Sequence, residues 1–140
     1  MPRRRKTRTW LMPQEVEVWY IIPAVRRELT RIMIDNGIAQ KNIADMLGVT
    51  EPAVTQYKLE KSKRSRGDQV EIPPNVQAEI ETSANRIHEA WLEKEEDEHV
   101  YELMTREINR IIDIMRDEGI ICEIHREHCE NVVEDCKACK

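Results

Sequence analysis

The stretch QKNIADMLGVTEPAVTQYK, residues 40–58, decides the fold of this 140-residue chain. Its two ends carry apolar residues at helical spacing, and Gly48 and Thr50 lie between them. Glycine tolerates the positive φ of a tight turn, threonine is a good N-cap, and Pro52 falls where a first helical turn accepts proline. We therefore predict one short helix over residues 40–47 and a second from residue 51 to about residue 59.

The spacing within this stretch is that of a helix-turn-helix. The small residue Ala44 falls where two helices cross closely, and Gly48 falls at the turn. The apolar positions that would lock the two helices together are Ile43, Leu47, Val49, Val54 and Tyr57. Such a unit places its second helix in the major groove of DNA. The alternative is a helical hairpin in a core that merely has this pattern.

Polar residues are left for the outer face of the second helix. Side chains expected to reach base edges are Thr50, Glu51, Thr55, Gln56 and Lys58. Gln40 is placed for a phosphate, and sequence-independent attraction would come from Lys41, Lys58, Lys61, Lys63, Arg64 and Arg66. We therefore expect double-stranded DNA as the partner.

The sequence before this unit is basic at its start and then helical. Residues 1–9 form either a solubilising tail or an arm that touches DNA. Pro23 suits the first turn of a helix over residues 24–36, which Gly37 would close as its C′ residue. Charge separates the two halves, because residues 1–67 hold 14 Lys/Arg and 7 Asp/Glu whereas residues 68–140 hold 8 and 20. Only the first half suits a polyanion.

Residues 15–57, EVEVWYIIPAVRRELTRIMIDNGIAQKNIADMLGVTEPAVTQY, resemble the archaeal branch of the Xre-type, lambda-repressor-like transcription regulators. The cysteine-rich end adds a looser likeness. The resemblance implies an all-α bundle of four or five helices that binds near-palindromic DNA as a dimer. It also implies that DNA is contacted by Gln40, Thr50, Glu51, Thr55 and Gln56.

We expect three regions: a DNA-binding domain over residues 1–70, a helical dimerisation segment over 71–118 and a tail over 119–140. Two apolar stripes mark the middle region, and Gly119 should end its second helix. The first stripe is Val76, Ile80, Ile87, Trp91 and Leu92; the second is Val100, Leu103, Met104, Ile108, Ile111, Ile112 and Met115. Because a chain of this size has little else to bury them against, we predict a homodimer with Trp91, Leu103, Ile111 and Ile112 at interface or core positions. The alternative is a monomer in which both helices pack on the N-terminal bundle.

The tail contains all four cysteines, Cys122, Cys129, Cys136 and Cys139. Together they could hold a [4Fe–4S] cluster or Zn²⁺, and the set Cys122, His125, Cys136 and Cys139 is typical of structural zinc. Cysteines seven apart on one α-helix are about 10 Å apart, so a single metal requires a break in the helix between Cys122 and Cys136. Incidental cysteines and disulfides are the alternatives. We favour the cluster, as a redox, oxygen or iron sensor, because the zinc set leaves Cys129 unused.

Several function classes are disfavoured. No apolar run approaches the length of a membrane span and no signal peptide is evident, so we expect a cytoplasmic protein without a membrane partner. No nucleophile–base pair or phosphate-binding glycine loop suggests an enzyme or a small-molecule substrate. The competing function is an antitoxin-like interaction module that uses the acidic half.

Overall fold

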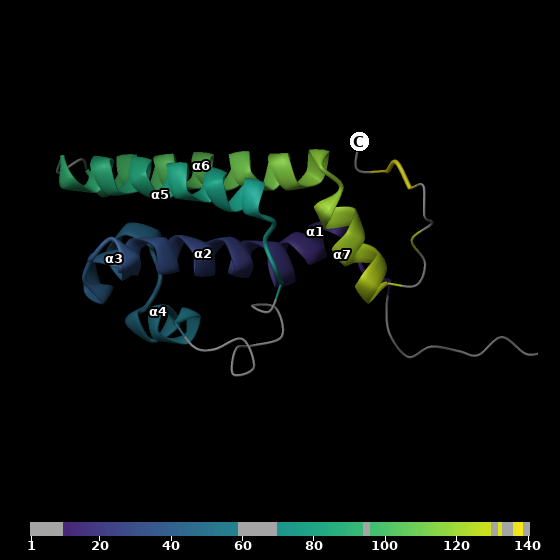
Figure 1. Cartoon of the computed structure of the whole chain (residues 1–140), viewed down its shortest axis with the longest axis horizontal. Coiled ribbons are helices and arrows are strands. Elements are labelled where there is room, and N and C mark those ends of the chain that lie inside the picture. Colours follow the sequence, from purple (N-terminus) through teal and green to yellow (C-terminus); the bar gives the residue numbers. More distant parts are fainter. Residues whose placement is uncertain (1–9, 59–69, 94–95, 130–131, 133–135, 139–140) are drawn as a thin grey trace, which may run out of the picture.

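The computed structural model describes residues 10–58, 70–93, 96–129, 132 and 136–138, and in these residues it is all-helical, as predicted. Helix α5 (Pro74–Leu92) and helix α6 (Asp97–Asp117) form an antiparallel layer. Below it lies a rod made of α1 (Pro13–Val16), the π-helix η1 (Glu17–Ile21) and α2 (Ile22–Asp35) (Figure 1). Helices α3 (Gln40–Leu47) and α4 (Glu51–Tyr57) follow at one end, with α4 on the side away from α5 and α6. Helix α7 (Ile120–His128) closes the opposite end.

The N-terminal rod is longer than the sequence predicted. We expected the helix to start at residue 24, but helical backbone begins eleven residues earlier, at Pro13. A proline inside an α-helix lacks its N–H donor and clashes with the carbonyl four residues before it. The wider π-turn just before Pro23, in which the Ile22 amide bonds the Glu17 carbonyl, accommodates the proline. The rod therefore continues through Pro23.

Helix α2 ends as predicted. Gly37 has φ 84°, and its amide donates to the Ile34 carbonyl at 2.9 Å. The Ile38 amide reaches back to the Met33 carbonyl at 3.1 Å. This pair of bonds is the Schellman motif, which needs a residue that tolerates positive φ at C′.

The α5–α6 layer packs against the rod, and one apolar core runs from α1 to α7. Of the two predicted stripes, Val76, Ile80 and Ile87 on α5 and all but Leu103 on α6 are buried. Leu92 is 58% exposed in the single chain, so the chain's own core does not cover it. The expectation that these helices have little else in the chain to bury them is wrong, because the N-terminal helices cover them. The homodimer itself stays a prediction.

A polar network joins α5 to α6 inside this layer. The buried Glu107 accepts hydrogen bonds from the Ser83 hydroxyl at 2.7 Å and from Arg86 and Arg110 at 3.1 and 3.2 Å. Arg110 also bonds the Glu79 carboxylate at 2.6 Å. Burial alone would raise the pKa of Glu107, but Ser83, Arg110 and Arg86 outweigh burial and lower it.

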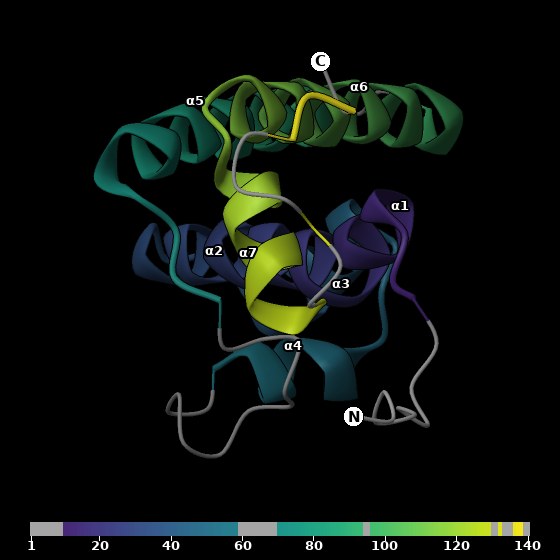
Figure 2. The ribbon, with the colours of Figure 1, turned by 90° about the vertical axis from the view of Figure 1, so that its right-hand side faces the viewer.

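Helix α7 is fastened to the start of the rod. Gly119, at φ 78°, ends α6 as predicted and lets the chain turn into α7. The His128 ring stacks on Tyr20 with centroids 4.2 Å apart, and His125 Nε2–H donates to the Leu11 carbonyl. Arg116, in the last turn of α6, donates to Glu17 at 2.7 Å. Figure 2 shows α7 crossing the end of the molecule between the α5–α6 layer and the side that carries α4.

Candidate nucleic-acid interface

Helices α3 and α4 are joined by a short turn with the predicted geometry. Gly48 adopts φ 65°, in the left-handed region, and ends α3 with its amide bonded to the Ala44 carbonyl. Thr50 is extended, and its side-chain oxygen accepts the Ala53 amide at 3.2 Å. The N-cap and the glycine turn therefore fix where α4 begins.

The inner faces of the two helices are apolar. Ile43, Leu47 and Val54 are fully buried, Ala44 fits at the crossing with 5% exposure, and Tyr57 is buried. Val49 is half-buried and packs against the core. The predicted apolar positions thus hold α4 against α2 and α3, and the polar side of α4 faces outward.

The side chain of Gln40 links the two helices. Its Nε2 donates to the Thr55 hydroxyl and to the Glu51 carbonyl, the latter at 3.4 Å. Thr55 in turn donates to the Glu51 carbonyl at 3.2 Å, and Lys58 Nζ lies 3.5 Å from Gln40 Oε1. The sequence placed Gln40 at a phosphate; the structure adds a bridging role between α3 and α4.

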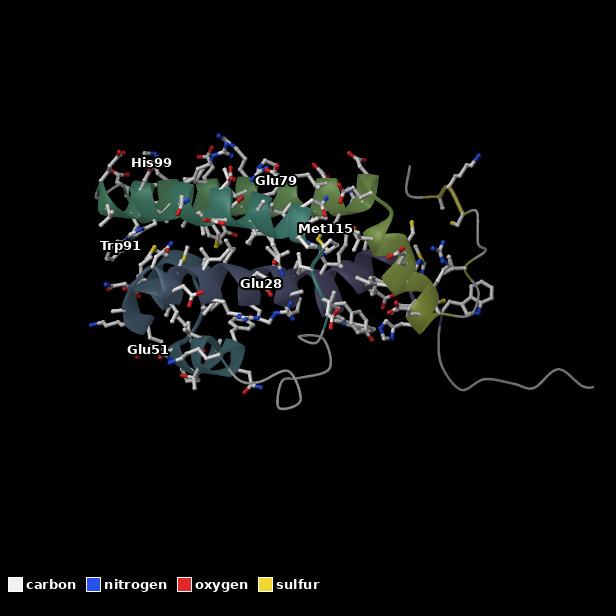
Figure 3. All side chains as sticks on the ribbon, viewed as in Figure 1. Glu28, Glu51, Glu79, Trp91, His99 and Met115 are labelled. Carbon is white, nitrogen blue, oxygen red and sulfur yellow. The ribbon has the colours of Figure 1, made fainter. Side chains whose placement is uncertain are left out.

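Five of the predicted contact residues come together on this outer surface. Gln40, Thr50, Glu51, Thr55 and Lys58 all belong to the start of α3 or to α4 and its caps. Lys41 is exposed on α3 and Gln56 is half-buried. Lys61, Lys63, Arg64 and Arg66, like the basic segment 1–9, lie outside the described residues. Figure 3 shows Glu51 on the opposite side of the molecule from Glu79 and His99 of the α5–α6 layer.

One supporting residue was not found from sequence. Arg27 on α2 is only 2% exposed, and its Nη2 donates to the Val70 carbonyl at 2.6 Å and to Glu28 at 3.1 Å. It thereby holds the segment that leads into α5 against α2. An arginine in an amphipathic helix looks like a surface residue, so sequence offered no signal for this contact.

The described part of the tail does not assemble either predicted metal set. Cys122 lies buried on α7, and Cys129 lies at its C-cap, seven residues on and so about 10 Å along the axis. The buried His125 ring bonds the Leu11 carbonyl instead. Cys136 is half-buried, Cys139 lies outside the described residues, and no three potential ligands gather among the residues that are described. The helix does end between Cys122 and Cys136, as a metal would require, but the donors that the structure describes do not gather at one point.

No disulfide joins any two of the described cysteines, which are Cys122, Cys129 and Cys136. Nor does any helix among the described residues have the length and apolar character needed to cross a bilayer.

No protein-family model matches the chain, and no match was found among curated proteins or solved structures.

Proposed function

We propose that this protein is a sequence-specific regulator that binds double-stranded DNA as a homodimer and inserts α4 into the major groove. The observation that carries the proposal is the two-sided character of α4. Val54 and Tyr57 anchor it in the core, while Thr50, Glu51 and Thr55 are exposed together. A helix held this way presents polar side chains to base edges without losing its support.

The charge near α4 supports the same partner. Lys41 and Lys58 are both exposed, and Lys58 lies beside the Gln40–Thr55 bridge. Phosphate contacts from such lysines would position the helix, and the side chains of α4 would supply sequence discrimination. The α5–α6 layer, which is acidic, lies on the opposite side, where its negative charge would not repel the DNA phosphates (Figure 1).

Binding to a random duplex library, followed by affinity measurements over a salt series on the enriched site, tests the proposal. The wild type should select a defined sequence, and its log affinity should fall linearly with log salt. Lys58→Gln should make that slope shallower by about two, because a homodimer loses two phosphate contacts, one from each subunit. Lys137→Gln, an exposed lysine near the C-terminus, is the matched control and should leave the slope unchanged.

Two results would contradict the proposal. One is a library that shows no enrichment; the other is an equal loss of slope in Lys58→Gln and Lys137→Gln. The first would rule out recognition of a specific DNA sequence, and the second would show that α4 is not the helix beside the DNA backbone.

Regulation by a cysteine-ligated [4Fe–4S] cluster, or a zinc staple in its place, is a separate proposal that rests on the cysteine spacing alone. DNA binding through α4 does not depend on it.

A further inference from the structure

Glu51 is the only acidic side chain on α4, and it occupies the first helical position. Its backbone is held from two sides, because its carbonyl accepts hydrogen bonds from Gln40 and from Thr55. Thr50 caps the helix just before it, and Pro52 restricts φ just after it. The backbone of Glu51 is therefore fixed relative to the core before any DNA is bound.

The carboxylate of Glu51 is exposed, and no described residue forms a hydrogen bond or ion pair with it. A free carboxylate beside DNA is repelled by phosphates and cannot donate a hydrogen bond. It is tolerated in the major groove only where a base offers a donor, and the donors there are the amino groups of cytosine N4 and adenine N6. At the base that it contacts, Glu51 thus accepts cytosine or adenine and rejects guanine and thymine.

The neighbours of the two amino groups separate cytosine from adenine. Adenine N6 lies beside the acceptor N7, which would face the second carboxylate oxygen. Cytosine N4 has only the C5–H on its outer side. We propose that Glu51 is a specificity-determining residue that requires cytosine at one fixed position of the DNA site, an assignment that rests on the proposed function.

Replacement of Glu51 by Gln tests this assignment, because glutamine keeps the shape but both donates and accepts. Library selections would be run with the wild type, Glu51→Gln and Glu81→Gln. Glu81 is an exposed glutamate on α5, so its variant makes the same change in net charge away from α4. Affinities for the enriched site and for its variants at the selected position would then be measured at one salt concentration.

The wild type and Glu81→Gln should favour cytosine at one position by about tenfold or more. Glu51→Gln should lose that preference and shift toward adenine, which glutamine bonds through N6 and N7. Preferences at the other positions should stay the same in all three proteins. A merely structural role for Glu51 would lower every affinity together and would not change one base preference.

Three outcomes would overturn the assignment. If Glu51→Gln selects the same site with the same ratios, or weakens all sites equally, Glu51 does not read a base while DNA binding stands. If the wild type requires no cytosine, another residue sets specificity. If the wild type binds no duplex at all, the proposed function falls and this assignment falls with it.

Discussion

The Ser83 hydroxyl on α5 donates a 2.7 Å hydrogen bond to the Glu107 carboxylate on α6, and both residues are buried. Arg86 and Arg110 complete the charge balance around this carboxylate. If either helix shifted along the other, the buried Glu107 carboxylate would lose its partners. The pair therefore fixes the register of the α5–α6 layer.

Glu107→Gln should lower the free energy of unfolding at neutral pH by about 1–3 kcal/mol, because Arg86 and Arg110 each lose a charged hydrogen-bond acceptor. The folded-state pKa of Glu107 is lowered, so its contribution is present above the unfolded pKa and is lost as pH falls through the folded pKa. The difference between wild type and variant in urea unfolding should therefore shrink under acid conditions.

The control for this prediction is Glu102→Gln, which removes an exposed carboxylate paired with Arg106 on the same helix. Exposed pairs of this kind contribute about 0–1 kcal/mol. Equal losses in Glu102→Gln and Glu107→Gln would show that the buried network has no special role.

Gly48→Ala should destabilise the chain by about 1–2 kcal/mol, because an L-residue at φ 65° is strained. Apart from Gly48 itself, its chain neighbours and the adjoining helix backbone, no described atom lies within 4 Å of the position that a Cβ would take, so the cost comes from the backbone conformation. Gly48→Asn should cost less, since asparagine tolerates this region. Thermal unfolding of both variants checks the order, and an alanine variant as stable as the wild type would contradict the turn geometry.

Ile111→Ala should cost about 2–5 kcal/mol, since Ile111 is 1% exposed within the chain's own core. The loss should not depend on protein concentration, because the site is buried without a second subunit. Leu92→Ala, at an exposed position, should change stability by less than about 0.5 kcal/mol.

Sedimentation over a range of concentrations then tests the homodimer independently. We expect a dimer in the wild type. If the loss of stability caused by Ile111→Ala changes with protein concentration, the core assignment of Ile111 is contradicted. A wild type that stays monomeric would contradict the dimer and leave the core assignment intact.

Cys122 is buried on α7, whereas the predicted cluster requires it to lie beside the other cysteines. A [4Fe–4S] cluster on all four cysteines should give about four iron and four sulfide per chain in oxygen-free preparations, with absorbance near 400 nm. Loading it would require α7 to open, so helical circular dichroism should fall when the cluster forms. A zinc centre would give about one zinc and no colour.

Cys122→Ser and Cys136→Ser separate metal binding from packing. Cys122 is buried on α7, so its variant should destabilise the chain even without metal, whereas Cys136→Ser should not. Protein without iron, sulfide or zinc would contradict any metal centre.

The sequence by itself determined the helical class and the features set by single residues. Gly37, Gly48 and Gly119 take the positive φ that only glycine adopts without strain, and Thr50 caps α4. These predictions succeeded because a turn or a cap depends on a few neighbouring residues. The apolar spacing in residues 40–57 succeeded for the same reason, since helical periodicity is local.

The tertiary structure decided which surfaces face one another. The sequence could not show that the rod covers α5 and α6, that Gln40 bridges to Thr55, or that Arg27 is buried at Val70. Nor could it show that His125 bonds Leu11, 114 residues away. Each of these contacts joins residues far apart in the chain, and its partner is chosen by packing rather than by any local preference. Apolar stripes indicate that a face is buried, but only the tertiary structure shows which element covers it.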